Sequence, residues 1–559
     1  MRTENRFGAL TVALLVAASA GPHAQGRGGG AWSTVGGDPQ RTGWARTDPR
    51  ISKESVAKPG LQLLWKRQLQ KGAAALTQPV LLPNIISYKG FKALAYLGGP
   101  GDAVYSIDYD LNRMFWETRL SSAAKGTLPA CAGGTIAVTR SATLGAPAAG
   151  RGGRGQGGPP PPAAAAPPTP GAPGTPPPAG GAPAGIPAGA GSPAPAAAQG
   201  AGGRGRGAGG GAGGGGGLGG GRGAGNNVYA VSTTGMVHAL NPQTGEDLNP
   251  PAKFTGGSAR LSGAVFIDSV VYAAVVEPCG GVASGVYAID LTENANTVSS
   301  FDAKGARLAG ALGPAFATDG TLFVATGGST GDVTYANAIV ALEARTLKPK
   351  DWFTAPAPFT SSPVVFTQGT RTLVAASNAD GSVYVLDAAA IGGADHKSPL
   401  AKSDQFSQAK EFAAGAITTW EDGGTRWIAA ATGGPLPGDA KFGQANGAVK
   451  SGGIVAFRLT GEGSATTLEP AWTSRDIERP GAPIVLNGVV FAVSAGAMGS
   501  GKGRSVLYAF DSATGKELWN SGNAMSSYVP GVPPSAGDGQ IYVVTADGTL
   551  HAFGIPLEH

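Results

Sequence analysis

The chain has 559 residues, of which 14% are charged, 94 are glycine and 43 are proline. Its formal net charge is +6, but five arginines without any acid lie between residues 145 and 225, and residues 1–24 carry one further net positive charge. The remaining chain is therefore close to neutral, which argues against a basic surface for nucleic acid. Low charge and very high glycine content favour an all-β protein that also contains a disordered portion.

The first 24 residues have the parts of a secretory signal peptide. Arg2 and Arg6 precede an apolar run from Phe7 to Ala18, and small residues follow where a signal peptidase would cleave. The run is too short to span a bilayer, and no later segment approaches about 20 apolar residues. No cysteine follows the leader as a lipid-anchor site. We expect a periplasmic or extracellular protein without a transmembrane segment in the mature chain.

Degenerate copies of one short sequence pattern, here called the blade phrase, recur along almost the whole chain. The phrase is clearest from Tyr508 to Trp519, where an apolar strand ends in a Thr-Gly turn and continues to a tryptophan. Variants lie at 229–245, 286–290, 339–342, 383–387 and 550–553. A repeat of roughly 45 to 60 residues built only from short strands is typical of a β-propeller. The sequence thus predicts an all-β fold, an eight-bladed β-propeller of four-stranded blades.

Cutting the chain by this phrase predicts blades that begin near residues 78, 129, 263, 313, 362, 415, 482 and 534. The last blade has no fourth strand of its own after Leu550–Phe553, whereas Leu61–Arg67 has the character of an isolated fourth strand. We therefore expect the N- and C-terminal strands to complete one blade together, which removes exposed sheet edges. The propeller would occupy residues 25–144 and 226–559, and no helix is predicted beyond the leader.

Residues 145–225 interrupt blade 2 with a Gly/Pro/Ala tract that contains Arg-Gly pairs. Such a tract cannot bury enough apolar surface to offset its chain entropy, so we expect a disordered spacer. The segment Ile136–Thr139 fits either the first or the second strand of the blade. The insert therefore lies between strands one and two or between strands two and three. The sequence does not decide on which face of the propeller it leaves the blade.

The two cysteines, Cys131 and Cys279, are predicted on one face of adjacent blades. Cys131 lies in or just before the inner strand of blade 2, and Cys279 lies in the loop 277–284 of blade 3. Export permits a disulfide between them. Two separate buried thiols are the alternative.

The most regular residues of the repeat have structural explanations. Gly515 allows the positive φ of a tight turn, and Trp519 lies on an outer strand, where it can pack between blades. Equivalent places are occupied by Trp65, Trp116, Trp352 and Trp472. Trp420 and Trp427 could stack on a sugar, but packing within blade 6 explains them more simply.

Common catalytic and metal-binding motifs are incomplete. The stretch Gly496–Gly503 is similar to a phosphate-binding loop, but Gly503 replaces the required Ser or Thr and the loop joins two predicted strands. The five histidines are not spaced with Cys, Asp or Glu as metal pairs. No nucleophile elbow precedes a helix. Hydrolase chemistry is therefore not supported.

Two regions of the chain resemble the pyrroloquinoline quinone (PQQ) repeat propellers. The first is near the N-terminus and consists of Trp32–Gly43, Ile51–Val56 and Leu63–Trp65. The second is the blade phrase Ala509–Trp519. With the weaker copies, the resemblance covers residues 32–559 apart from the insert. It implies one of two kinds of protein. Some members are quinoprotein dehydrogenases, which hold PQQ with Ca²⁺, and others, such as the propeller lipoprotein of the outer-membrane assembly machinery, bind no cofactor and organise protein partners.

The positions that carry dehydrogenase chemistry in this family differ here. Gly328, in the stretch Phe323–Ser329, stands where the resemblance places an asparagine ligand of Ca²⁺. The stretch Phe353–Pro363 contains no acid, although the family's catalytic base comes from the corresponding segment. The adjacent Cys-Cys pair and a Cys-x-x-Cys-His haem site are also missing. We therefore predict no cofactor, no metal ligand and no catalytic residue.

These observations favour a non-catalytic binding or protein-interaction scaffold in the cell envelope, with a small molecule or a polysaccharide as another class of ligand. The alternative is a divergent PQQ-dependent oxidoreductase of alcohols or sugars, with PQQ and Ca²⁺ as cofactors. Propeller sites are built in loops, and the candidate residues at the mouth of the funnel are Asp332, Asn337, Asp380, Asp439 and Arg479. Each of these five residues is explained more simply as a solvated polar residue of a loop.

Overall fold

A computed structural model describes residues 32–72, 76–87, 90–120, 137–140, 227–278, 280–292, 296–329, 331, 333–409, 412–413, 415–496 and 504–556. The chain divides into one unit of residues 1–150 and 216–559 and another of residues 151–215. Only the first unit contains described residues. The predicted leader and insert, the cysteines Cys131 and Cys279, and Asp332 lie outside the described residues.

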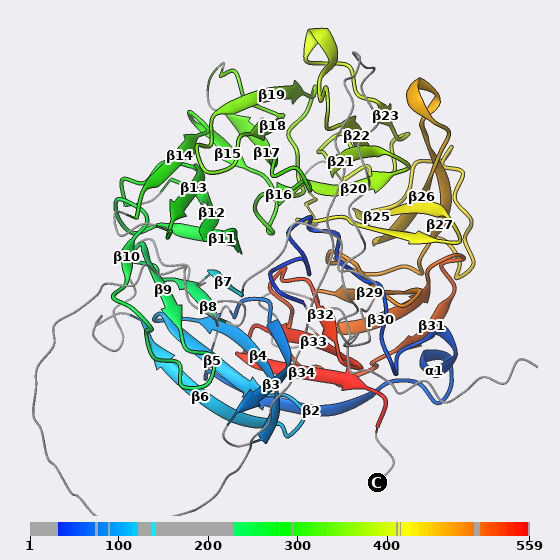
Figure 1. Cartoon of the computed structure of the whole chain (residues 1–559). Coiled ribbons are helices and arrows are strands. Elements are labelled where there is room, and N and C mark those ends of the chain that lie inside the picture. The colour runs from blue at the N-terminus through cyan, green and yellow to red at the C-terminus, as the bar shows by residue number, and fades with distance from the viewer. Residues whose placement is uncertain are drawn as a thin grey trace, which may run out of the picture. The chain divides into compact units, whose positions relative to one another are not determined.

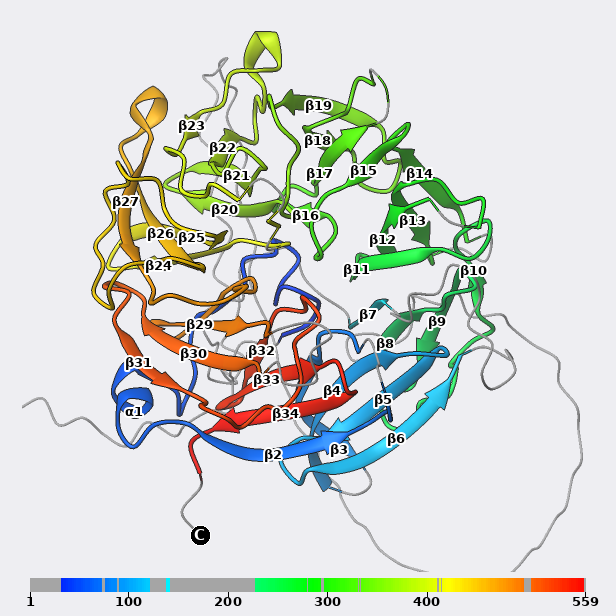
Figure 2. The ribbon, with the colours of Figure 1, turned by 180° about the vertical axis from the view of Figure 1, so that it is seen from behind.

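Eight antiparallel sheets surround a common centre in the first unit (Figures 1 and 2). In blades 1 to 7 the strands follow one another from the centre outward in chain order, so each sheet is a four-stranded meander. Blade 4 has one additional short strand, and β1 adds to the inner side of blade 7. The predicted eight-bladed β-propeller is confirmed.

The strands of blades 1 to 4 are as follows. In blade 1 they are β3 (Val80–Ser87), β4 (Gly90–Gly99), β5 (Ala103–Asp108) and β6 (Arg113–Arg119), and in blade 2 they are β7 (Ala137–Arg140), β8 (Val228–Val231), β9 (Met236–Leu240) and β10 (Ala252–Lys253). In blade 3 they are β11 (Arg260–Ile267), β12 (Val270–Glu277), β13 (Gly285–Asp290) and β14 (Val298–Asp302), and in blade 4 they are β15 (Ala306–Leu308), β16 (Ala315–Phe316), β17 (Leu322–Ser329), β18 (Ala338–Leu342) and β19 (Pro349–Thr354).

The strands of blades 5 to 8 complete the ring. In blade 5 they are β20 (Val364–Gln368), β21 (Arg371–Ser377), β22 (Val383–Asp387) and β23 (Ala401–Lys402), and in blade 6 they are β24 (Thr418–Asp422), β25 (Thr425–Gly433), β26 (Gly452–Thr460) and β27 (Thr467–Thr473). In blade 7 they are β1 (Trp44–Ala45), β28 (Ile484–Leu486), β29 (Val489–Ser494), β30 (Val506–Asp511) and β31 (Glu517–Asn520), and in blade 8 they are β32 (Ser535–Gly537), β33 (Gln540–Thr545), β34 (Thr549–Gly554) and β2 (Gln62–Gln68).

Blade 8 closes the ring with strands from the two ends of the described chain. β2 pairs antiparallel with β34, with Lys66 opposite His551 and Gln68 opposite Thr549. The predicted fourth strand at Leu61–Arg67 is therefore confirmed almost residue for residue. Closure satisfies the outer edge of β34, which would otherwise be an exposed sheet edge in the middle of the ring.

Outer-strand tryptophans join several blades to the next blade, as the repeat predicted. Trp472 of blade 6 donates a hydrogen bond from Nε1 to the Ser512 carbonyl of blade 7 at 2.9 Å, and its ring covers the turn at Gly515. Trp116 makes the same contact to the Pro242 carbonyl of blade 2 at 2.9 Å. A Cβ at Gly515 would lie 2.5 Å from the Trp472 ring. The glycine is therefore needed for space as well as for its φ of 71°.

The segment of residues 32–43 lies at the centre of the ring, where its backbone carbonyls accept hydrogen bonds from the inner strands. The donors are the amides of Leu81, Phe316, Val365, Thr419 and Val485, at 2.8 to 3.0 Å. These amides belong to blades 1, 4, 5, 6 and 7, so one segment satisfies inner sheet edges that would otherwise be unpaired. The sequence of this segment carries a family resemblance, but its position at the centre of the ring was not predicted.

Arg41 anchors this central segment. The side chain is 1% exposed, and its guanidinium donates to the carbonyls of Pro314, Val35 and Gly263 and to the Thr34 hydroxyl, at 2.6 to 2.9 Å. Burial lowers the pKa of Arg41 to about 9, although the nearby Asp38 opposes this shift. One side chain thereby ties the segment to blades 3 and 4.

One expectation needs correction. A five-residue helix, α1 (Lys53–Ala57), follows the central segment, although no helix was predicted. Ser52 caps it in a reciprocal pair with Ser55, a Ser-x-x-Ser variant of the capping box. Short 3₁₀ turns lie at Gly393–Asp395 and Gly463–Ala465. The expected start of blade 2 near residue 129 lies outside the described residues, and its first described strand is β7.

β7 also settles where the insert interrupts blade 2. Arg140 at the end of β7 pairs with Val228 at the start of β8, so residues 141–227 join the first and second strands. Because all blades repeat the same strand directions, the turns between first and second strands share one face of the ring. We call it the hairpin face. The opposite face, which carries the loops between second and third strands and the links between blades, is called the connection face.

Candidate functional site

The connection face contains a hollow of about 290 Å³ near the central segment. Its apolar lining comes from links and strand ends of four blades and from Val35 of the central segment: Leu261, Val276, Ala311, Leu312, Pro530, Val532 and Pro533. Arg260 is its one charged lining residue, and Gln78 lies at its floor. The hollow is close to the lower end of the volumes usual for ligand pockets, about 300 Å³.

Polar groups hold the floor of the hollow in place. The Gln78 amide donates from Nε2 to the carbonyls of Pro533 and Pro534, at 3.1 and 2.6 Å, and its Oε1 accepts from the Gly36 amide at 2.7 Å. At the rim, Arg260 donates to Glu277 at 2.8 Å. The polar groups that position the walls are thus already bonded to the protein. What faces the hollow is mainly hydrocarbon, which suits an apolar group.

Four of the five predicted funnel-loop residues are described, and all four lie in loops of the connection face. None of them lines the hollow. Asp439 and Arg479 are both exposed side chains. Asn337 follows the loop of blade 4, and its Oδ1 is buried without a hydrogen-bond partner in the described chain. These residues do not form one site, and their proposed role in ligand binding remains a prediction.

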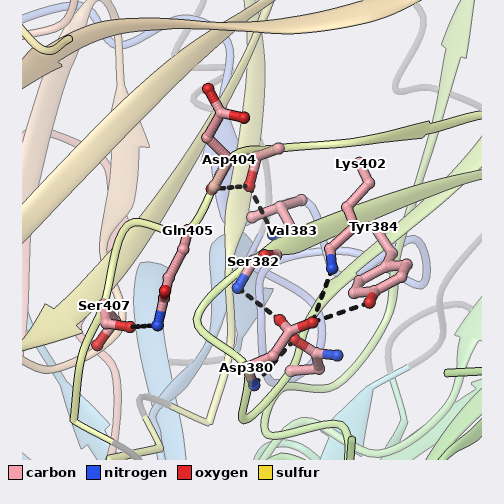
Figure 3. A network of polar contacts seen from close by, with 10 residues as sticks. Asp380, Ser382, Val383, Tyr384, Lys402, Asp404, Gln405 and Ser407 are labelled. Atoms are coloured by element: carbon pink, nitrogen blue, oxygen red, sulfur yellow. Dashed lines mark hydrogen bonds and ion pairs between the residues drawn. The ribbon is translucent and has the colours of Figure 1, made fainter. Parts of the chain in front are cut away.

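Asp380 is the exception, because it lies in a compact polar network of blade 5 (Figure 3). Its Oδ2 accepts hydrogen bonds from the Tyr384 hydroxyl and from Lys402 Nζ, both at 2.9 Å, and its Oδ1 accepts from the Ser382 amide. Burial raises the pKa of Asp380, but the bonds from Lys402 and Tyr384 outweigh it, so the pKa lies below its usual value. The carboxylate is therefore charged, and both of its oxygens already accept hydrogen bonds from the protein, as in a structural ion pair.

The same network explains the neighbouring turn. Lys402 Nζ lies 4.9 Å from the centre of the Tyr384 ring, and Ser403 Oγ accepts from the Val383 amide while donating to the Asp404 carbonyl. Gln405 donates to the Ser407 carbonyl at 2.9 Å. The hydroxyl, amide and ammonium donors of the network bond to residues of blade 5 and its link to blade 6, whereas the exposed Asp404 carboxylate points away from the network (Figure 3). The network therefore fixes the link to blade 6.

The positions that would hold Ca²⁺ and PQQ do not carry suitable groups. A Cβ at Gly328 would meet only Pro358 at 3.5 Å and Asn337 Oδ1 at 3.9 Å, so a single neutral amide oxygen lies beside the position of the missing ligand. Where the resemblance places the base, Phe359 packs against Phe353 and Tyr384 with ring centroids 6.4 and 5.9 Å apart. Among the described residues, no group of three or more His, Cys, Asp or Glu could hold a metal. The residues present therefore do not fit the cofactor pair.

Trp420 and Trp427 are packed within blade 6 and present no open aromatic face for a sugar. Their rings stack 5.7 Å apart with an interplanar angle of 10°. The exposed fractions are 1% and 7%. Packing between two strands, β24 and β25, thus accounts for both residues, as the simpler interpretation held.

The comparisons with known proteins agree with this geometry. The family model of outer membrane protein assembly factor BamB matches residues 413–555, which contain blades 6 to 8 apart from β1 and β2. The resemblance to the PQQ-repeat propellers is confirmed. No curated protein sequence matches the chain.

Solved structures extend the likeness at the level of the fold. The quinohemoprotein alcohol dehydrogenase from Comamonas testosteroni is 14% identical, with a TM-score of 0.51 over 95% of this chain and 82% of that chain. A second quinohemoprotein alcohol dehydrogenase, from Pseudomonas putida HK5, gives 14% and 0.51 over 95% and 81%. BamB from Moraxella catarrhalis is 13% identical, with a TM-score of 0.38. The alignment covers 60% of this chain and 82% of the BamB chain. At these identities the PQQ-repeat likeness shows architecture and not activity.

Sequence reasoning missed the hollow itself. Its lining combines residues as far apart as Val35, Leu261 and Val532, and only the ring geometry brings them together. Pro530–Pro534 carried the one available signal, a run of Pro, Gly and Val in a link between blades. No helix among the described residues is long and apolar enough to cross a membrane.

Proposed function

We propose that this PQQ-repeat propeller is an exported, non-catalytic binding scaffold, and that the hollow of the connection face receives an apolar segment of a protein partner in the cell envelope. The observation that carries the proposal is the lining of the hollow, which is mainly apolar, with Arg260, Gln78, Thr77 and Ser262 as its polar residues. Exposed apolar concavities of this kind mark sites of association. The leader at residues 1–24 supports export.

Two further observations support a scaffold. The predicted positions of the Ca²⁺ ligand and the catalytic base are held by Gly328 and by packed phenylalanines, so a dehydrogenase would need a different set of groups. The matching family model is named for an outer-membrane assembly factor, and it covers the blades that provide Pro530–Pro533. A peptide segment would gain affinity from burying apolar side chains, with Arg260 at the rim to orient a polar end.

The proposal is tested by site-specific photocrosslinking in cells that export the full chain. A photoreactive phenylalanine at Val532, which lines the hollow, should give a discrete crosslinked product, and the substitution Val276→Lys should abolish that product by placing a charge in the hollow. The same photoreactive residue at Thr346, an exposed position of the hairpin face, serves as the control. Identical products at Val532 and Thr346, or no product at Val532, would contradict the proposal.

One local observation favours the alternative, a divergent PQQ-dependent oxidoreductase. The unpartnered Asn337 Oδ1 lies beside Gly328, and an amide oxygen is a ligand that Ca²⁺ accepts. A single neutral oxygen is too few for a site that needs 6–8 oxygen ligands. The alternative therefore requires ligands from elsewhere, and direct titration of PQQ distinguishes it from the scaffold.

A further inference from the structure

A second pocket, on the hairpin face, differs from the hollow in its chemistry. It has a volume of about 60 Å³, room for several water molecules at roughly 10–15 Å³ each. Its walls come from the central segment and from the first hairpins of blades 4, 5 and 6, which contribute Thr318, Thr367, Thr372 and Arg426. Arg46 and Trp44 complete it from the end of the central segment. The pocket thus differs from the hollow in carrying two arginines, Arg46 and Arg426, beside apolar walls from Trp44, Val365 and Phe366.

Arg426 is a buried cation with an unused donor. Its side chain is 8% exposed, and one guanidinium nitrogen, Nη2, donates to the Thr367 carbonyl and to Glu421 at 2.9 Å each. Its Nε is buried and has no hydrogen-bond partner in the described chain. An N–H of a buried guanidinium without an acceptor is costly, because the lost hydration is not replaced.

Arg46 adds a second guanidinium that forms no ion pair with a described carboxylate. It is exposed, and its contact is with the indole of Trp44, whose centroid lies 4.5 Å from Arg46 Cζ. Arg426 Cζ lies 5.8 Å from the same indole centroid. Two like charges therefore gather around one aromatic ring. Burial lowers the pKa of Arg426, Glu421 opposes this, and the charge of Arg46 lowers it further.

The acids at the pocket do not cancel this charge. Both carboxylate oxygens of Asp38 accept from Thr42, at 3.0 Å from the amide and 2.5 Å from the hydroxyl. Burial raises the pKa of Asp38 against the effect of these bonds and of Arg41 and Arg46. Glu421 is half exposed and bonds to Nη2 of Arg426. Glu421 thus pairs with Arg426, and Asp38 is the acid near Arg46, whose guanidinium forms no ion pair with a described carboxylate.

We propose that this pocket binds an oxyanion, a carboxylate or phosphate group of a ligand, between Arg426 and Arg46. The guanidinium of Arg426 would donate to the anion at the wall of the pocket, and the exposed guanidinium of Arg46 would donate to it from the surface. The hydroxyls of Thr318, Thr367 and Thr372 provide neutral donors at the wall. The volume admits a single small anionic group, so the rest of a larger ligand would extend over the hairpin face.

Isothermal titration calorimetry on the full mature chain tests the site. Inorganic phosphate and acetate are titrated separately at constant ionic strength. Binding of both anions would establish a general oxyanion site, phosphate alone would assign it to a phosphorylated ligand, and acetate alone to a carboxylate. Absence of saturable binding of either anion would overturn the proposal.

A matched pair of variants places the binding in this pocket. Arg46→Gln removes one charge-assisted donor from an exposed side chain, and we expect its dissociation constant to rise about tenfold with the fold intact. Arg458→Gln removes an exposed arginine of β26, in the same blade as Arg426 but outside the pocket. This variant should bind the anion as the wild type does. Equal binding by wild type and Arg46→Gln, or equal weakening by both variants, would show that the anion binds elsewhere.

Discussion

Single residues define how tightly the blades fit, and one close contact lies where an outer-strand tryptophan meets the glycine of the next turn. Gly515→Ala would place a Cβ 2.5 Å from the Trp472 ring at a φ of 71°. Positive φ costs about 1 kcal/mol for alanine, and overpacking adds roughly 1–3 kcal/mol. We expect urea denaturation to show a loss of about 2–4 kcal/mol. Gly424→Ala, at a φ of 79° but with no heavy atom within 4 Å, should lose only about 1 kcal/mol. Equal losses would show that the contact does not limit packing.

His551 gives the fold a dependence on pH. The side chain is 3% exposed, and burial lowers its pKa, although Asp547 opposes the shift. Because the folded state binds this proton less readily, stability is complete above the unfolded pKa of about 6.5 and falls as the pH drops below it, by up to about 1.4 kcal/mol per pH unit. His551→Leu should therefore reduce the loss of unfolding free energy between about pH 7.5 and pH 5.5. An unchanged loss in the variant would assign the pH dependence to other groups.

Among the elements, the central segment has the widest reach, and Arg41 is its anchor. Arg41→Met keeps most of the buried volume but leaves four acceptors of the guanidinium without a donor. Each unpaired buried acceptor costs roughly 1–3 kcal/mol, so we expect a loss of at least about 3 kcal/mol in urea denaturation. Arg458→Met, at an exposed position of β26, should change the stability little. A stable Arg41→Met variant would mean that the segment does not hold the inner strands.

The elements also show how far sequence reasoning reaches. The strand at Leu61–Arg67, the turn at Gly515 and the packing role of Trp472 were predicted, because each follows from a local pattern of apolar residues, glycine and tryptophan. The position of residues 32–43 was not predicted, since its hydrogen bonds join residues that are hundreds of positions apart, such as Arg41 and Pro314. The hollow and the Arg426 pocket were missed for the same reason. The candidate residues Asp439 and Arg479 share a face with the hollow but not a site.

For the whole molecule, the location of the insert leads to a prediction about folding. Arg140 and Val228 pair across the end of the first hairpin of blade 2, so the pair can be joined by a two-residue Asn-Gly turn in place of residues 141–227. Each doubling of loop length costs about 0.6 kcal/mol in closure entropy. We therefore expect this shortened chain to be as stable as the full chain or more stable in urea denaturation. Loss of folding would show that the propeller needs the replaced residues.

We propose that this PQQ-repeat propeller binds a partner and lacks the dehydrogenase cofactor site. The most direct measurement is a titration of PQQ into the purified mature protein, with and without Ca²⁺, followed by absorbance and tryptophan fluorescence. With Gly328 in the ligand position and phenylalanines in place of the base, the expected result is no saturable binding under either condition. Stoichiometric binding that requires Ca²⁺ would contradict the claim and would show that the chain has built the site from other residues.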